Sequence, residues 1–375
     1  MPIRYTTNNL KKTKQLSVVR QNSKYSVRLE MMTNIAVIIP FYQAEDGILR
    51  RALESIEMQQ LPAGVRLKVV VVDDASPHPA SAELKGFSFK GAHSLNVITQ
   101  VNSGPAGARN TGLNSLAGEE IDFISFLDSD DIWNPLHIQR ALSALRNSDF
   151  FFCNHIRSKH YGDYFRCLPE TWQALSQNRG AGQSQLVKAF AAGELTRTMI
   201  RECPPQTSTV VYNFRKNPNL RFNTSLRSAG EDHIFWIELS IDNATAVDVR
   251  VNVSCGEGLN LYWSNVSWES PKSISIQGCL AIQYNYMRNN SRIYCMDIET
   301  ITFRQRLYEG AYVYALLRGA AKRFLPDPKV FAKLVSHYPA FILRSPTNLA
   351  FFVMNRKVMT DVTSVKNVPS ADLAA

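Results

Sequence analysis

Phe123-Ile124-Ser125-Phe126-Leu127 is a short apolar run, and Asp128-Ser129-Asp130-Asp131 follows it directly. Such a run is typical of a buried strand, and Ile132-Trp133-Asn134-Pro135 predicts a turn into a helix. Three carboxylates at a strand end repel one another, and burying one of them unpaired is costly. A divalent cation relieves this repulsion, because Mg²⁺ and Mn²⁺ bind carboxylate oxygens and often share them with substrate phosphates. The cluster therefore indicates either a metal site for a nucleotide or phosphorylated substrate, or an acidic helix N-terminus.

Strands and helices alternate upstream of this cluster. Strands are predicted at 35–39, 69–72, 96–99 and 123–127, and helices at 47–60 and from the Gly-rich turn 102–107 to Leu116. This order predicts an α/β fold with an open, mostly parallel sheet, in which ligands bind beyond the carboxyl ends of the strands. Polar residues follow every predicted strand, among them Tyr42, Asp73 and Asp74. The shared rim favours a binding site over a simple helix cap.

Composition narrows the class of protein. The chain has 375 residues, 45% of them hydrophobic, and a formal net charge of +10. That excess predicts an anionic partner, but no RNA-binding or zinc-finger spacing occurs, so no nucleic acid is expected. Six scattered cysteines predict free thiols in a cytoplasmic protein. We expect neither a secretory signal nor a transmembrane helix, because no run of about 18 apolar residues occurs.

The chain divides by composition into three parts. Residues 1–33 are basic and predict a flexible arm, residues 34–260 hold the α/β domain, and residues 261–375 form a basic, mainly helical extension. Within the domain, strands and helices alternate regularly over 34–150 and less regularly over 151–260. The basic helices between 274 and 357 either pack on the domain with a solvated face or lie on an anionic membrane, and we favour the membrane.

Five motifs in order resemble family 2 glycosyltransferases, which are inverting enzymes of the GT-A fold with nucleotide-sugar donors. They are Ile38–Tyr42, Val72–Ser76, Gly104–Gly112, Asp128–Asp131 and Glu231-Asp232, and the resemblance covers residues 34 to 240. Residues 41–53 are similar to bacterial exopolysaccharide glucosyltransferases of succinoglycan-type assembly. Gln43 replaces the usual Asn. The Gln-x-x-Arg-Trp motif of processive members does not follow Glu231-Asp232, which implies a single-addition transferase.

The resemblance implies that 34–150 is the nucleotide-sugar half of the domain and 151–260 the acceptor half. It also implies a role for each matched residue. Asp130 binds a divalent metal, and Asp128 contacts the ribose or the water shell of the metal. Asp131 is either a supporting residue or a helix cap. The nucleotide pocket involves Pro40, Tyr42, Glu45 and Asp74. Asp74 accepts a hydrogen bond from the base, which favours UDP, whereas Asp73 is a structural turn residue.

The remaining implied residues surround the diphosphate and the acceptor. Gly107 and Arg109 lie beside the diphosphate, where Arg109 contacts either phosphate or Asp128. Asp232 is the implied catalytic base, and Glu231 orients it or contacts the acceptor. The resemblance thus implies an inverting transferase that moves a hexose, preferably glucose, from a UDP-sugar to a lipid-linked or surface oligosaccharide at the inner face of the cytoplasmic membrane. The alternative is a catalytically silent module that binds nucleotide or glycan.

Overall fold

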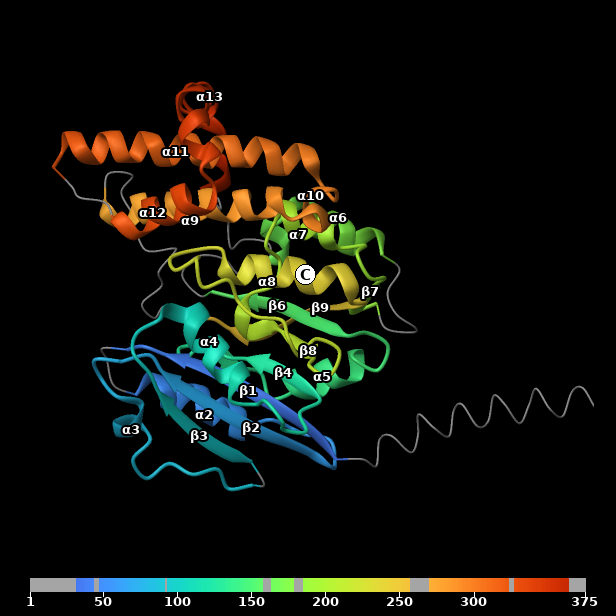
Figure 1. Cartoon of the computed structure of the whole chain (residues 1–375). Coiled ribbons are helices and arrows are strands. Elements are labelled where there is room, and N and C mark those ends of the chain that lie inside the picture. The colour runs from blue at the N-terminus through green and yellow to red at the C-terminus, as the bar shows by residue number, and fades with distance from the viewer. Residues whose placement is uncertain are drawn as a thin grey trace, which may run out of the picture.

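The protein folds as one mixed sheet with helices on both faces and a further group of C-terminal helices (Figure 1). The structure, a computed structural model, describes residues 32–43, 47–91, 93–157, 163–178, 185–256, 270–323 and 327–363, with side chains up to 357. Helix α8 lies between the sheet and the C-terminal helices in Figure 1. The predicted α/β class is confirmed.

The first half of the sheet is parallel. Strand β1 pairs on one side with β2, which pairs with β3, and on the other side with β4. Their bounds are Thr33–Phe41, Val65–Asp73, Ser94–Thr99 and Phe123–Phe126. The chain therefore builds outward from β1 in one direction and then returns to its other side. Such a reversal opens a crevice at the carboxyl ends of the strands, here those of β1 and β4.

The second half of the sheet mixes directions. The strands are β8 (Val211–Asn213), β6 (Phe150–Ile156), β9 (Thr245–Ser254), β5 (Ile132–Trp133) and β7 (Val187–Phe190). Strand β8 runs antiparallel to β4 and β6, and β6 runs parallel to β9. The turn predicted at Ile132–Pro135 is wrong in part, because Ile132 and Trp133 pair with β9 as strand β5. Buried Trp133 explains this, since its indole Nε1–H donates to the Ser208 carbonyl at 2.7 Å.

Helices cover both faces of the sheet. They are α2 (Ile48–Glu57), α3 (Ala80–Glu83), α4 (Gly104–Asn114), α5 (His137–Ala144), α6 (Pro169–Gln177), α7 (Thr196–Arg201) and α8 (Glu231–Asp242). Leu49, Ala52, Leu53 and Ile56 of α2 are buried at helical spacing, as the sequence predicted. Helix α4 packs so closely on β1 that a Cβ at Gly112 would lie 2.5 Å from Ile38 Cγ2.

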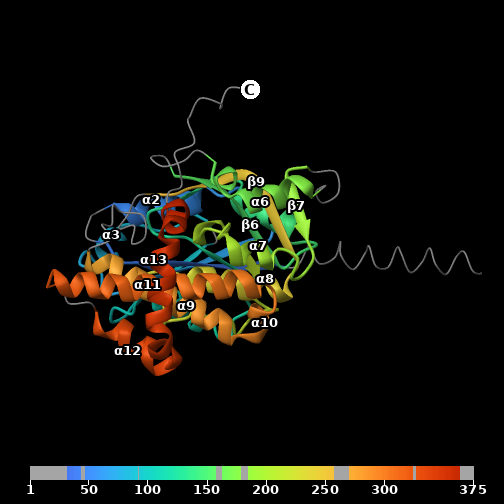
Figure 2. The same ribbon diagram turned by 90° about the horizontal axis from the view of Figure 1, so that it is seen from above.

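The C-terminal region is helical, as predicted. Its helices are α9 (Pro271–Asn289), α10 (Ser291–Tyr294), α11 (Ile298–Ala321), α12 (Pro328–His337) and α13 (Ala340–Thr363). Figure 2 shows α13 crossing α11. The crossing depends on Gly310, because a Cβ there would overlap the Asn348 carbonyl oxygen. One cluster of buried apolar side chains runs from β1 through α8 to α13, so these helices share the core of the sheet.

Basic residues of this region do not all face solvent. Arg344 donates to buried Glu309, and Arg304 lines the cavity described below. The reading of a uniformly solvated basic face therefore fails for these two side chains. Among the described residues, none of the helices combines the length and the apolarity needed to span a membrane. All six cysteines are described and carry free thiols.

Candidate active site

A cavity of about 990 Å³ lies beyond the carboxyl ends of the parallel strands. Most of the predicted site residues line it, namely Pro40, Tyr42, Asp74, Arg109, Asp128, Asp130 and Asp232. Gly107 lies behind the wall in the first turns of α4, where an added Cβ would come within 2.5 Å of Ser103 Cβ. Glu45 falls outside the described residues. The structure thus brings segments that are 192 positions apart, from Pro40 to Asp232, to one cavity.

The ends of β1 and β2 form one wall of the cavity. Tyr42 is 43% exposed there and offers its ring as a surface for a flat ligand. The Asp74 carboxylate accepts hydrogen bonds from Ser103 N–H at 2.7 Å and Gly104 N–H at 2.8 Å, which tie β2 to the start of α4. Asp73 accepts bonds from backbone N–H groups at 76 and 80, so its predicted structural role is confirmed.

Arg109 connects the acidic cluster to α8. Its Nη2 donates to Asp128 Oδ1 at 2.9 Å, and its Nη1 donates to Glu231 Oε1 at 3.2 Å. The guanidinium is buried and lies 5.3 Å from the centroid of the Phe222 ring. Of the two roles predicted for Arg109, these contacts show the one that holds Asp128 in place. Because the same group binds Glu231, it also fixes the start of the helix that carries Asp232.

Asp131 supports the cluster from behind. Its carboxylate accepts hydrogen bonds from Ser208 Oγ at 2.6 Å, Gln206 Nε2 at 2.9 Å and Gly256 N–H at 2.8 Å. Burial, and then the charges of Asp130 and Asp128, raise the pKa of Asp131 to about 8. The helix-cap reading of Asp131 is wrong, because the next helix, α5, begins six residues later at 137.

The residues at the cluster fit a divalent metal. Within the described chain, the Asp130 carboxylate has no hydrogen-bonding or ion-pair partner from another residue, although it is largely buried. Burial and the Asp128 charge raise its pKa, and a cation would relieve both effects. No group of three or more His, Cys, Asp or Glu side chains among the described residues is arranged to hold a metal alone. A cation here would need oxygens from a ligand or water as well.

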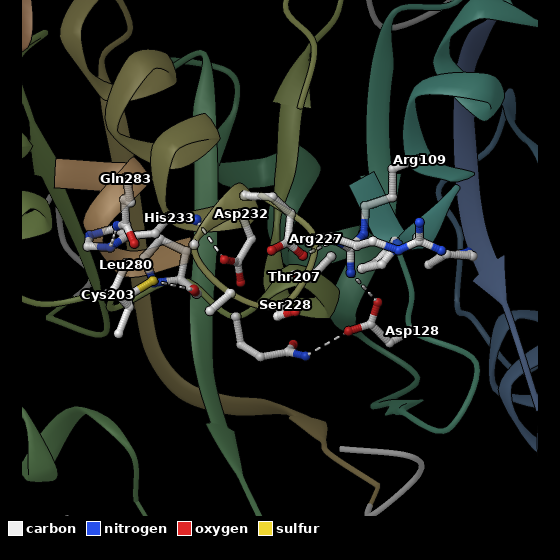
Figure 3. A pocket seen from close by; sticks show the side chains of 18 of the residues that line it. Arg109, Asp128, Cys203, Thr207, Arg227, Ser228, Asp232, His233, Leu280 and Gln283 are labelled. Carbon is white, nitrogen blue, oxygen red and sulfur yellow. Dashed lines mark hydrogen bonds and ion pairs between the residues drawn. The ribbon is translucent and has the colours of Figure 1, made fainter. Parts of the chain in front are cut away.

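Asp232 projects into the cavity from the N-terminal turn of α8, as Figure 3 shows. Its Oδ1 accepts the His233 backbone N–H at 2.7 Å, and its Oδ2 has no partner in the described part of the chain. The helix N-terminus stabilises the charged carboxylate. Asp232 and Asp128 therefore face one cavity from two elements, α8 and the end of β4 (Figure 3).

His233 anchors this turn rather than facing the reaction space. Its Nε2–H donates to the Met199 carbonyl, and its Nδ1 accepts a bond from Gln283 Nε2 at 2.8 Å. Burial lowers its pKa, so it stays neutral. Gln283 also packs on Gly230, where φ is 89° and an added Cβ would overlap the amide oxygen. Helix α9 therefore braces the loop that presents Asp232.

Several residues of the cavity escaped the sequence reasoning. Gln206 and Ser208 hold the acidic cluster, and Arg227 lies across the start of α4, with its Nη2 donating to Asn102. Arg227 lies four residues before Glu231, and its closeness to that motif is the one signal that would have marked it. The C-terminal helices add Leu280, Gln283, Tyr284, Arg304 and Tyr308. Nothing in their helical pattern distinguished these residues from core positions.

The chain belongs to glycosyl transferase family 2. The model of that family matches residues 36–196, and the predicted family is thereby confirmed. The chain is 30% identical over 320 residues to the succinoglycan biosynthesis protein ExoW of Rhizobium meliloti, a match that covers 83% of this chain and 96% of ExoW.

Two further comparisons are shorter or more distant. The chain is 34% identical over 153 residues to the UDP-Glc:alpha-D-GlcNAc-diphosphoundecaprenol beta-1,3-glucosyltransferase WfgD of Escherichia coli, covering 40% of this chain and 57% of WfgD. Among solved structures, the mannosyltransferase PcManGT from Pyrobaculum calidifontis in complex with GDP-Man and Mn²⁺ matches with a TM-score of 0.50 and 16% identity. That match covers 90% of this chain and 88% of PcManGT, and it shows the fold.

Proposed function

We propose that this protein is an inverting transferase that moves a glucosyl residue from UDP-glucose to a lipid-linked oligosaccharide in exopolysaccharide biosynthesis. The observation that carries the proposal is the meeting of Asp130 and Asp232 in one cavity. In this proposal, Asp130 binds the cation that a departing diphosphate needs, and Asp232 is the base that an acceptor hydroxyl needs. The similarity to ExoW and WfgD supports the pathway and the glucosyl donor.

The donor nucleotide occupies the end of the cavity next to β1 and β2. Pro40 and Tyr42 flank the uracil, Asp74 receives its N–H, and Glu45 lies near the ribose. Support comes from the exposed ring of Tyr42 beside the buried Asp74 carboxylate. Residues 34–150 would then form the nucleotide-sugar half and 151–260 part of the acceptor half.

The diphosphate lies between the start of α4 and the acidic cluster. Asp130 would hold a divalent metal, and Asp128 would contact the ribose or the water shell of that metal. A bound metal would stabilise the negative charge of the leaving group. Gly107 leaves room for Ser103 and Gln100, which both donate to Asp74. Arg109 keeps Asp128 directed at the cavity. Arg227 adds a guanidinium at the same wall.

Transfer with inversion needs a single in-line displacement. Asp232 Oδ2 takes the proton from the acceptor hydroxyl as the hydroxyl oxygen attacks the anomeric carbon. The bond between that carbon and the diphosphate oxygen breaks, and UDP leaves on the opposite side. Glu231 does not reach the acceptor in this account, because it is buried against Arg109. Its role is to hold the first turn of α8 in place, so that the adjacent Asp232 points at the reaction space.

A lipid-linked acceptor would require the enzyme to work at the inner face of the cytoplasmic membrane. Helices α12 and α13 expose apolar side chains, among them Leu343 at 83% and Met354 at 75%. Exposed Lys329 and Arg356 and half-buried Lys333 lie on the same two helices. Apolar side chains with interspersed cations fit an anionic lipid surface.

A donor screen tests the proposal. The purified full-length chain is incubated with UDP-glucose, UDP-galactose, UDP-GlcNAc, GDP-mannose and dTDP-glucose, each with Mg²⁺, Mn²⁺ or EDTA. We expect UDP-glucose to stabilise the protein and to release UDP slowly, only when metal is present. Binding of UDP without any hydrolysis or transfer on lipid extracts would favour the silent module, and preference for another nucleotide would overturn the donor assignment.

A further inference from the structure

The C-terminal helices form part of the cavity wall beyond Asp232. Leu280 and Gln283 of α9 lie on the opposite side of Asp232 from Arg109 and Asp128 (Figure 3). Tyr284, Arg304 and Tyr308 line the same cavity. A cavity of about 990 Å³ is at the upper end of the range for ligand sites. It therefore has room for a second ligand beside the nucleotide.

Arg304 is held rigidly in this wall. Its Nη1 donates to the Ile200 carbonyl at 3.2 Å and to Tyr284 Oη at 3.0 Å, and its Nη2 donates to the Arg201 carbonyl at 2.6 Å. Tyr284 in turn stacks on Tyr308, with ring centroids 5.2 Å apart. A guanidinium that is fixed in advance loses little freedom on binding a ligand.

The charge of Glu170 acts on Arg304 from a distance, but no acid contacts its guanidinium directly within the described chain. Its three acceptors are neutral oxygens, and no carboxylate within the described chain forms an ion pair with it. Neighbouring Arg201, in contrast, pairs with Asp297 and Glu170. Arginine has five N–H donors, of which these bonds use three. A largely buried cation with two remaining donors thus faces the cavity.

Arg304 also lies close to His233, the residue that follows the proposed base. His233, which follows Asp232, donates to the Met199 carbonyl, and Arg304 donates to the next two carbonyls of the chain. Burial is the main cause of the lowered pKa of His233, and the charge of Arg304 contributes to it. An anion bound at Arg304 would therefore belong to a ligand whose adjacent part reaches Asp232.

We propose that Arg304, with Tyr284 and Tyr308, forms an anion subsite for the diphosphate of a lipid-linked acceptor. The inference rests on the proposed function and deepens it. It narrows the acceptor to a lipid diphosphate that carries a single sugar rather than an oligosaccharide. That sugar would lie between Asp232 and Arg304, with its lipid diphosphate on the guanidinium. Guanidinium groups bind phosphate oxygens through paired N–H donors. The donor diphosphate has its own site on the Arg109 side of Asp232, so the two anions are bound apart.

Binding in the presence of UDP tests this subsite. Saturating UDP and Mg²⁺ fill the donor site, and farnesyl diphosphate and uncharged farnesol are then titrated into the full-length chain by calorimetry. We expect the wild type to bind the diphosphate and not the alcohol at the same concentration. Arg304→Gln should weaken diphosphate binding about ten- to a hundredfold and leave UDP affinity unchanged. The matched control is Arg306→Gln, whose guanidinium stacks on Phe351 outside this cavity.

Two further variants separate binding from folding. Arg304→Lys keeps the charge but loses the paired donors, and Tyr284→Phe removes only one hydroxyl contact of Arg304. Each should therefore lower the diphosphate affinity less than Arg304→Gln does. The melting temperature of both variants should stay near that of the wild type. The subsite is overturned if the wild type, Arg304→Lys and Arg304→Gln bind farnesyl diphosphate with equal affinity. It is also overturned if UDP displaces farnesyl diphosphate. Failure of the wild type to bind UDP would instead count against the proposed donor site.

Discussion

Arg109 donates to Asp128 at 2.9 Å, and this ion pair joins helix α4 to the end of strand β4. The same guanidinium binds Glu231 at the start of α8. One side chain thus sets the relative position of the proposed metal site and the proposed base. A lysine has a single ammonium and does not reproduce this forked contact.

Arg109→Lys should therefore lower kcat more than it raises the KM for donor. We expect a loss of about 10²-fold, comparable with the loss of one preorganised contact at a reacting centre. Steady-state UDP release measures it. Arg215→Lys is the control, because Arg215 pairs with Asp122 at the surface. A kcat within twofold of the wild type would show that Arg109 does not position the site.

The pH dependence of stability follows from Glu231. Burial, and then the charge of Asp232, raise its pKa from 4.5 to about 7, with Arg109 opposing the shift. The folded state therefore keeps a proton that the unfolded state releases, so the free energy of unfolding falls as pH rises from about 4.5 to 7. Glu231→Gln removes this component. Urea unfolding at pH 5 and pH 8 measures the free energy of unfolding of both proteins. Relative to the wild type, the variant should be more stable at pH 8 than at pH 5. The same stability difference between variant and wild type at both pH values would contradict the assignment.

Gly256 leaves room for the Asp130 carboxylate. An added Cβ would overlap the Asp130 carbonyl oxygen and lie 2.7 Å from Oδ2. Gly256→Ala should therefore displace Asp130, the proposed metal ligand. Because the position of a ligand must be held closely for binding, metal-dependent UDP binding should weaken about tenfold or more. Gly91→Ala is the matched control, because its Cβ meets nothing closer than 3.9 Å. Unchanged metal dependence in Gly256→Ala would argue against Asp130 as the ligand.

Glu309 should dominate the stability of the C-terminal helices. It is fully buried and accepts bonds from Arg344 at 2.6 Å, Asn348 at 2.6 Å and Asn285 at 2.7 Å, so that it links α9, α11 and α13. Arg344→Met leaves the carboxylate buried without its cation and should cost about 3–5 kcal/mol of unfolding free energy. Breaking the exposed pair of Arg292 and Asp242 should cost less than about 1 kcal/mol. Equal losses for the two changes in urea titration would refute this ranking.

Membrane binding should depend on α12 and α13. Replacing both Leu343 and Met354 with Asp removes exposed apolar contacts and adds negative charge, so co-sedimentation with phosphatidylglycerol vesicles should fall several-fold. Val101→Asp is the control, since Val101 is 86% exposed outside these helices. If the double variant sediments like the wild type, or if neutral vesicles bind equally well, the membrane proposal is contradicted.

Local sequence patterns predicted which residues at the ends of β1, β2 and β4 line the cavity. Apolar runs such as 35–39 and 69–72 form continuous buried strands, so their ends reveal which polar residues share a rim. The direction of Asp128 depends on Arg109 and Gln206, which come from distant segments, and it needed the folded chain.

The part of the cavity wall formed by the C-terminal helices was not predictable in the same way. Arg304 and Tyr284 lie within amphipathic helices, where a core position and a cavity position have the same periodicity. What distinguishes Arg304 is the lack of an ion-pairing acid in the described chain, and that is a property of tertiary packing. The short pairing of Ile132 and Trp133 with β9 escaped prediction for the same reason, since its partner lies more than 100 residues away.

The most direct test is the transfer rate of Asp232→Asn with UDP-glucose, metal and a lipid-linked acceptor extract. Asparagine keeps the shape of the side chain but cannot take up the acceptor proton, so we expect transfer to fall by about 10²–10⁴-fold, while calorimetry shows UDP binding within about twofold of the wild type. Transfer at the wild-type rate would contradict the assignment of Asp232 as the base, and with it the central claim that this cavity catalyses glycosyl transfer.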